Sequence, residues 1–268
     1  MLNLPKWLTE ASKWKMDNSF KNAPEELKDF LDFKAAQYEH PRFIETDPIS
    51  LAHRFSQKED IEIVAFLMAT IAWGNRQSII KSGEKLLAIL GPSPLEYILA
   101  YRNGTCPPFI HRTFNQEDLN GFFLGLQNLY INGGLQHAFQ GKSNRLDEYI
   151  LHFRAQFVPF LQPRSHKHVA DPSKGSAAKR LVMFLRWMVR SPQKGVDFGL
   201  WDHIPLHALH VPLDVHTGNI ARKLGLITRK QNDWQTNLEL QQQLLVFDAN
   251  DPAKYDFALF GLGAFEKF

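Results

Sequence analysis

Residues 60–73 read DIEIVAFLMATIAW, and this stretch decides the fold class of the chain. Apolar side chains occupy almost every position, whereas a helix at a protein surface carries them on one stripe only. A run of this length is also too long for an ordinary buried strand. We therefore predict a helix that is buried on all sides, with other helices packed around it.

Three further segments show the 3.6-residue period of helices that bury one face. Residues 77–90 have apolar side chains at helical spacing and end at Gly91-Pro92. Residues 118–130 carry one apolar stripe, and residues 145–161 form a helical pattern closed by Pro163. Alternating runs that would indicate strands are scarce. The sequence therefore predicts an all-α fold of about a dozen helices with short connections.

Composition indicates an ordinary globular protein. The chain has 268 residues, of which 44% are hydrophobic and 22% are charged, so it is long enough to bury a core. Its single cysteine, Cys106, excludes an internal disulfide and suits a reducing cytoplasm. No signal-peptide pattern and no apolar run of membrane-spanning length is present. We expect a cytoplasmic protein without a membrane partner.

The formal net charge of +3 is small, but basic residues concentrate in one segment. Between residues 164 and 194 the chain has eight basic residues and a single acidic residue, Asp171. The basic residues are Arg164, Lys167, Lys174, Lys179, Arg180, Arg186, Arg190 and Lys194. Such an excess suits a polyanionic partner, although a solvated surface gives the same pattern.

Two residues in the second half of the chain are candidates for chemistry. Residues 211–225 read VPLDVHTGNIARKLG, in which Asp214 can cap a helix beginning at Val215. Lys179 opens the run KRLVMFLRWMVR at the start of another helix, where the helix dipole and Arg180 both oppose a positive charge. A neutral lysine amine is a nucleophile. Each residue also has a structural interpretation, Asp214 as a cap and Lys179 as a solvated side chain or phosphate contact.

The lysine run and the Pro-x-Asp-x-His pattern that ends at His216 resemble the helix-hairpin-helix DNA glycosylases. The resemblance covers about residues 60–268. It is closest to an uncharacterised bacterial and archaeal family related to archaeal 8-oxoguanine DNA glycosylases, whose lysine-to-aspartate separation it matches. It implies two helical lobes with a cleft between them, a hairpin near residues 162–179, and a helical segment 1–59 packed on this core.

The same resemblance implies a function and a set of site residues. A glycosylase flips a damaged base out of the duplex, and an oxidised purine is the first candidate here. Lys179 would attack C1′, with possible strand cleavage, and Asp214 would stabilise the cationic sugar. The implied DNA contacts are Asn75, Arg76 and Gln77 in a gap-filling loop, and Lys174, Gly175 and Arg180 around the hairpin. The implied base pocket contains Trp201, His216 and Phe257.

The resemblance also bears on cofactors and assembly. A hairpin of this family can hold a monovalent cation against DNA phosphates, but Asp171-Pro-Ser-Lys-Gly175 has one glycine where the family motif has two. One cysteine cannot supply the four ligands of an iron–sulfur cluster. We expect no other cofactor, no bound metal, double-stranded DNA as the partner, and a monomer.

Two alternatives remain open. The first is a non-catalytic nucleic-acid-binding protein on the same scaffold. The second is a metal-dependent hydrolase, because His203, His207 and His210 precede Asp214 in a ligand-rich stretch. Pro205 weighs against the hydrolase, since it breaks the helix that would align the first two histidines.

Overall fold

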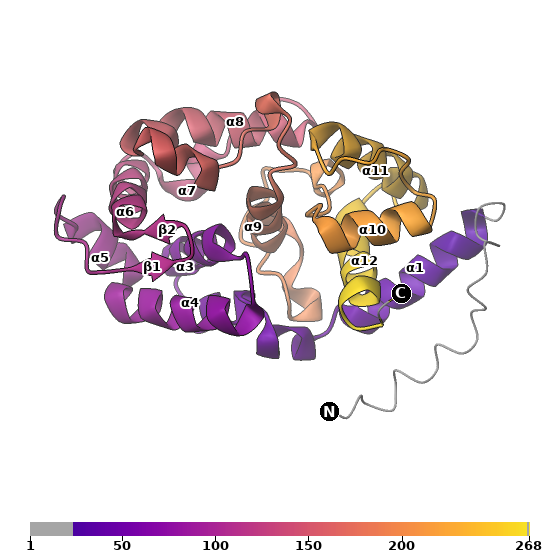
Figure 1. Cartoon of the computed structure of the whole chain (residues 1–268), viewed down its shortest axis with the longest axis horizontal. Helices are drawn as coiled ribbons and strands as arrows, with labels where there is room; N and C mark the ends of the chain where they lie inside the picture. Colours follow the sequence, from indigo (N-terminus) through magenta and orange to yellow (C-terminus); the bar gives the residue numbers. More distant parts are fainter. Residues whose placement is uncertain (1–23, 267) are drawn as a thin grey trace.

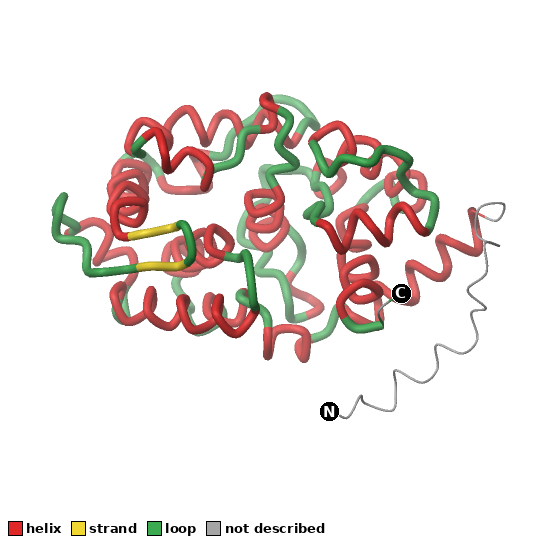
Figure 2. The backbone as a smooth tube through the Cα atoms, in the orientation of Figure 1, coloured by secondary structure: helices red, strands yellow, loops and turns green. Residues whose placement is uncertain are grey.

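The structure is a computed structural model that describes residues 24–266 and 268. It is mostly helical, which confirms the predicted all-α class. Figure 1 shows α3 to α8 on one side of the molecule and α1 with α10 to α12 on the other, with α9 between them. The structure has short 3-10 turns in several connections, and Figure 2 shows one small hairpin, in which Ile110–His111 (β1) pairs antiparallel with Phe114–Asn115 (β2).

The helices on the first side and the central helix are α2 (Ile49–Ala52), α3 (Lys58–Ile71), α4 (Arg76–Leu90), α5 (Pro94–Ala100), α6 (Gln116–Ile131), α7 (Gly134–Ala138), α8 (Leu146–Phe157) and α9 (Lys179–Val189). The helices on the second side are α1 (Pro24–Tyr38), α10 (Val215–Lys223), α11 (Trp234–Phe247) and α12 (Tyr255–Ala264). The 3-10 turns are η3 (Pro41–Thr46), η4 (Val158–Phe160), η5 (Pro163–His168), η6 (Pro172–Lys174), η7 (Pro192–Lys194), η8 (Leu206–Ala208) and η9 (Pro252–Lys254).

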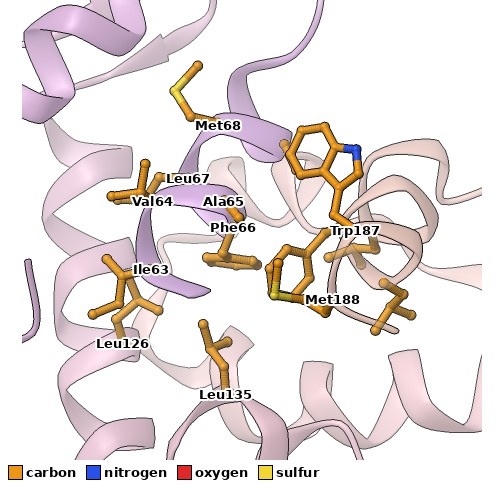
Figure 3. Close-up of a cluster of buried hydrophobic side chains, with 14 of the residues drawn as sticks. Ile63, Val64, Ala65, Phe66, Leu67, Met68, Leu126, Leu135, Trp187 and Met188 are labelled. Atoms are coloured by element: carbon orange, nitrogen blue, oxygen red, sulfur yellow. The ribbon is translucent and has the colours of Figure 1, made fainter. Parts of the chain in front are cut away.

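Helix α3 is the buried central helix that the sequence predicts. Every residue from 60 to 71 is buried, and Figure 3 shows its side chains packed against those of α6, α7 and α9. Phe66 contacts four other phenylalanine rings at centroid distances between 5.3 and 5.8 Å. The apolar run thus forms the centre of the larger hydrophobic cluster, which includes α3 to α9.

One carboxylate lies inside this cluster and is satisfied there. Glu62, on α3, accepts hydrogen bonds from Trp201 Nε1 at 2.6 Å and from the Tyr130 hydroxyl at 2.8 Å. Burial raises the pKa of Glu62, although these two donors act in the opposite direction. A buried polar group without such partners would cost stability, so Trp201 and Tyr130 have a structural task.

A second hydrophobic cluster joins the two ends of the described chain. Phe30 and Leu31 of α1 pack with Leu259 and Leu262 of α12 and with the apolar faces of α10 and α11. Helix α2 packs against α3 and α4 instead. Both helices of the predicted segment 1–59 therefore contact the rest of the chain, while residues 1–23 lie outside the described residues. The division at residue 59 stays a prediction.

The connection between α8 and α9 differs in detail from the predicted hairpin. The helix expected over residues 145–161 ends at Phe157, because Pro159 has no N–H and obstructs the preceding turn. The chain then passes through η4, η5 and η6, and α9 begins at Lys179. This connection is a series of 3-10 turns, so a helix-hairpin-helix unit remains a proposal.

No helix in the described part of the chain combines the length and hydropathy that crossing a membrane requires.

Candidate active site

Lys179 is placed by a left-handed backbone turn immediately before it. Ala178 has φ 47° and ψ 31°, a conformation that costs a residue with a Cβ atom roughly 1–2 kcal/mol. Ser176 Oγ accepts a hydrogen bond from the Ala178 N–H at 3.2 Å, and Ala178 is buried. Strain of this kind persists only where surrounding contacts hold it, and it concentrates at functional sites. The turn makes Lys179 the first residue of α9.

Asp214 is the cap of α10, as the sequence predicts. Its Oδ1 accepts a hydrogen bond from the Thr217 N–H at 2.9 Å, and α10 begins at Val215. Its Oδ2 accepts a hydrogen bond from Lys179 Nζ, also at 2.9 Å. The two carboxylate oxygens therefore have separate tasks. One oxygen holds the side chain in place, and the other faces the lysine amine.

The pair is partly open to solvent. The Lys179 side chain is 35% exposed and the Asp214 side chain is 18% exposed. Burial raises the pKa of Asp214, but the charge of Lys179 and the hydrogen bond from the Thr217 N–H lower it by more than burial raises it. The pKa of Asp214 therefore lies below the ordinary value of 3.8. Asp214 is therefore ionised at neutral pH. A negative charge is fixed beside an amine that a substrate can reach.

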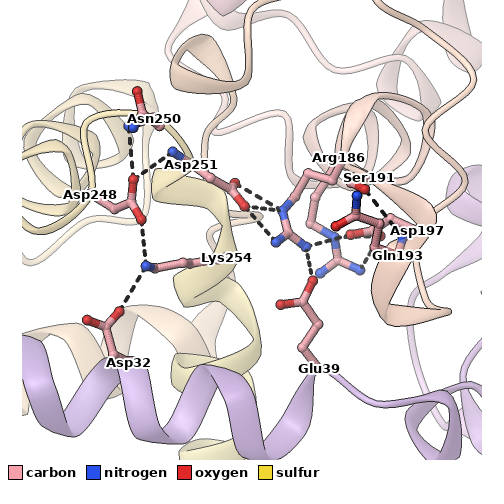
Figure 4. A network of polar contacts seen from close by, with 11 residues as sticks. Asp32, Glu39, Arg186, Ser191, Gln193, Asp197, Asp248, Asn250, Asp251 and Lys254 are labelled. Carbon is pink, nitrogen blue, oxygen red and sulfur yellow. Dashed lines mark hydrogen bonds and ion pairs between the residues drawn. The ribbon is translucent and has the colours of Figure 1, made fainter.

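A network of charges joins the later part of α9 to neighbouring elements, and Figure 4 shows part of it. Arg186, two helical turns after Lys179 on α9, pairs with Asp256 of α12 and with Asp197 Oδ1 at 3.2 Å. Arg190 pairs with the other oxygen of Asp197 at 2.8 Å and with Glu39 and Asp251. Because a buried ion pair that loses one member is strongly destabilising, this network fixes α9 against α12.

Asp256, on α12, pairs with Arg186 and has no role among the predictions from the sequence. Burial raises its pKa to about 6 against the opposing charge of Arg186, and the negative charge of Asp214 adds to the rise. The signal in the sequence was an acid in the otherwise apolar run YDFALFGLGA. A charged residue in such a run is a buried polar group that needs a partner.

Comparison with known proteins assigns the chain to a family. The model of DUF2400, a family of proteins of unknown function, matches residues 47–265. The chain belongs to this family. No curated protein and no solved structure matches it. The DUF2400 match includes Lys179, Asp214 and Asp256, whereas α1 precedes it.

In this DUF2400 chain, the predicted gap-filling loop forms the start of α4. Asn75 caps that helix, since its Oδ1 accepts hydrogen bonds from the N–H groups of Gln77 and Ser78 at 2.9 and 3.3 Å. Arg76 pairs with Asp47 at 3.6 Å and lies over the ring of Phe260. Asn75 and Gln77 are exposed. The polar side chains of this loop thus reach solvent, with Arg76 directed toward α12.

Arg180 points away from the Lys179–Asp214 pair. Its guanidinium donates to the carbonyl oxygens of Thr70 at 2.5 Å and Lys167 at 3.1 Å, and it lies 4.7 Å from the centre of the Trp73 ring. These contacts connect α9 to the end of α3. By contrast, Lys174 and Gly175 are exposed on and after η6. The structure therefore leaves Lys174 and Gly175 accessible and gives Arg180 structural partners.

The three residues of the predicted base pocket are not brought together. Trp201 is 2% exposed and belongs to the larger cluster, where it bonds Glu62. Phe257 is buried between Phe43 and the guanidinium of Arg186. His216 is exposed on α10. A hollow of about 560 Å³ lies elsewhere, over α8, η4 and η5, and none of these three residues lines it.

The histidines of the hydrolase alternative point in different directions. His203 Nε2 lies 2.6 Å from the Phe139 carbonyl oxygen, and His210 stacks on Trp234 inside the molecule. Over residues 24–266 and 268, no group of three or more His, Cys, Asp or Glu side chains is placed to hold a metal ion. The ligand-rich stretch of sequence does not converge in space.

Proposed function

We propose that this protein is a DNA glycosylase with an associated lyase step, and that it removes a damaged base from double-stranded DNA. The observation that supports this proposal most is the contact of 2.9 Å between Lys179 Nζ and Asp214 Oδ2. An amine nucleophile beside a fixed carboxylate, both partly exposed, suits attack on a sugar carbon that develops positive charge. The resemblance of the sequence to DNA glycosylases implies a catalytic role for the same two residues.

In the proposed reaction, departure of the base precedes attack by the lysine. The bond between C1′ and the base nitrogen breaks, and the base leaves with both electrons of that bond and takes up a proton. The positive charge left on C1′ and the ring oxygen faces the Asp214 carboxylate. Lys179 gives one proton to the departing base and donates its lone pair to C1′. A second proton then passes from this nitrogen to the ring oxygen as the bond between C1′ and that oxygen breaks, which leaves a Schiff base. Asp214, whose pKa lies below 3.8, stays ionised throughout and faces the cationic sugar.

The fixed geometry of Asp214 supports the electrostatic part of this mechanism. Because Thr217 N–H holds Oδ1 and α10 presents its positive end to the carboxylate, the charge needs no reorganisation when the sugar cation forms. Removing a preorganised charge or hydrogen-bond donor of this kind typically costs about 10²-fold or more in rate.

The remaining parts of the proposal concern DNA. Exposed Lys174 would meet phosphates, and Asn75 and Gln77 would fill the gap left by the flipped base. The finer description of the fold, a helix-hairpin-helix glycosylase with a cleft between two lobes and a monovalent cation near η6, belongs to the same proposal. An oxidised purine is the first candidate substrate.

A panel of duplexes, each with one defined lesion, tests the function. We expect release of a free base from at least one lesion duplex and none from undamaged DNA. Lys179→Gln should lose this release, whereas Lys85→Gln, on the exposed face of α4, should retain it. Release by the Lys179 variant at the normal rate would remove the lysine from the mechanism.

The ion pair itself favours a second candidate, a nucleic-acid-binding protein without catalysis. A lysine held by a carboxylate at 2.9 Å is also a common structural contact between two helices. Salt-dependent binding of duplex DNA, with no base released from any lesion, would support this alternative.

A further inference from the structure

The end of the loop between α10 and α11 and the first residue of α11, residues 229–234, contact both Asp214 and the segment immediately before Lys179. Arg222 of α10 fixes this loop by donating hydrogen bonds to the carbonyl oxygens of residues 229, 230 and 231 at 2.7, 2.9 and 3.1 Å. A single guanidinium bonded to three successive carbonyls restrains the backbone of an otherwise exposed loop. We call residues 229–234 the clamp loop.

One contact of the clamp loop reaches the main chain of Asp214. Asn232 Nδ2 donates to the Asp214 carbonyl oxygen at 3.0 Å, and Asn232 Oδ1 accepts from Arg222 at 2.7 Å. The same Asp214 carbonyl accepts the first hydrogen bond of α10, from the Gly218 N–H at 2.9 Å. Asn232 thus holds the backbone of the residue whose side chain faces Lys179.

Gly218 makes room for this contact. Glycine is a weak helix former, so its presence inside α10 needs a reason. A Cβ atom added at Gly218 would lie 2.5 Å from Asn232 Oδ1 and 3.0 Å from Asn232 Nδ2. Any side chain at this position would therefore force the Asn232 amide to shift, together with the Arg222 guanidinium that holds it, whose Nη1 would lie 2.9 Å from the added Cβ.

Another contact of the clamp loop reaches the chain before Lys179. The Trp234 N–H donates to the Gly175 carbonyl oxygen at 2.9 Å, and Asp233 forms an isolated antiparallel bridge with Ser176. Ser176 in turn accepts the hydrogen bond from Ala178 at the left-handed turn. The loop is thereby joined to the segment that sets the direction of Lys179.

We propose that the clamp loop sets the distance between Lys179 and Asp214, and that Asn232 is the positioning residue within it. This inference rests on the proposed function for its effect on catalysis, but its effect on the ion pair does not. A direct connection between the backbones that carry an amine and a carboxylate restrains the distance between the two groups, and residues 232–234 contact both backbones. A misplacement of about 1 Å far from the chemistry can cost about 10²-fold in rate.

Two variants test this inference. Asn232→Ala removes the amide, and Gly218→Ala displaces it while leaving it present. Asn115→Ala is the control, because Asn115 also bonds backbone N–H groups at a helix start but lies in the other part of the molecule. Thermal melting shows that each variant is folded. Three quantities are then measured: the pKa of Asp214 by NMR of its carboxyl carbon, the rate of single-turnover excision, and the affinity for DNA.

We expect the pKa of Asp214 to rise toward 3.8 in both variants and to remain at its wild-type value in Asn115→Ala. Excision should fall about tenfold to a hundredfold while DNA affinity changes less than about twofold. An unchanged Asp214 pKa in folded Asn232→Ala would overturn the inference. If the wild-type protein excises no lesion, the proposed function fails, yet the Asp214 titration still decides whether the clamp loop positions the pair.

Discussion

The substitution Asp214→Asn separates the capping role of this residue from its charge. Asparagine keeps an oxygen that can accept the Thr217 N–H, which now lies 2.9 Å from Oδ1. It removes the negative charge that faces Lys179 at 2.9 Å. The substitution therefore changes the electrostatics of the site while leaving the start of α10 intact.

The expected loss of stability is modest and follows from exposure. Lys179 is 35% exposed, so the ion pair is screened and contributes about 0.2–1 kcal/mol. The charge at the helix start adds about 0.3–1 kcal/mol. We expect Asp214→Asn to lower the free energy of unfolding by about 1 kcal/mol, and Asp214→Ala by about 1 kcal/mol more because the cap is also lost. Asp233→Asn, on the similarly built cap of α11, provides a comparison for stability.

Urea unfolding at several pH values measures this loss. The pKa of Asp214 in the folded protein lies below its ordinary value of 3.8, so its charge stabilises the fold above that pH. The difference between wild type and Asp214→Asn should be constant from pH 7 to about 5 and shrink as the pH falls through 3.8 and below. A loss above about 3 kcal/mol, or a difference that grows toward acid pH, would refute a solvent-screened pair held by its cap.

Other predictions follow from the same contacts. Arg186→Met should lower the free energy of unfolding by about 3–5 kcal/mol, because it leaves buried Asp197 and Asp256 without this partner. The loss for Arg186→Met should be smaller at pH 5 than at pH 8, because the unpaired carboxyls can take up protons. Arg145→Met, at an exposed ion pair, should change the free energy of unfolding little. Equal losses for the two variants would contradict the structural role of the buried network. Lys174→Gln should reduce the slope of log affinity for duplex DNA against log salt by about 0.9, weakening all sequences alike. A slope equal to that of wild type would mean that Lys174 meets no phosphate.

Local patterns predicted the helices that dominate the fold. The apolar run at residues 60–73 predicted α3, and the cap signal at Asp214 predicted the first residue of α10. Both signals act within a few residues of the chain, where propensity and hydrogen bonding are decided by neighbours. Local patterns cannot predict the contact between Lys179 and Asp214, because these residues are 35 positions apart in the sequence. Only the resemblance to glycosylases placed them together.

Non-local contacts account for what the sequence did not predict. Arg180 was expected to face DNA, but the carbonyls of Thr70 and Lys167 and the ring of Trp73 are brought to it by packing of α9 on α3. Trp201 was expected in a base pocket, yet buried Glu62 uses its indole N–H. The left-handed turn at Ala178 has no signal in the sequence, since alanine rarely adopts it.

Covalent capture tests the central claim most directly. Borohydride added during the reaction with a lesion duplex reduces a Schiff base to a stable bond between protein and DNA. We predict that peptide mapping places this bond on Lys179, that Lys179→Gln forms no adduct, and that Asp214→Asn forms it more slowly by about 10²-fold. An adduct mapped to another residue, or equal capture by Lys179→Gln, would contradict the assignment of Lys179 as the nucleophile.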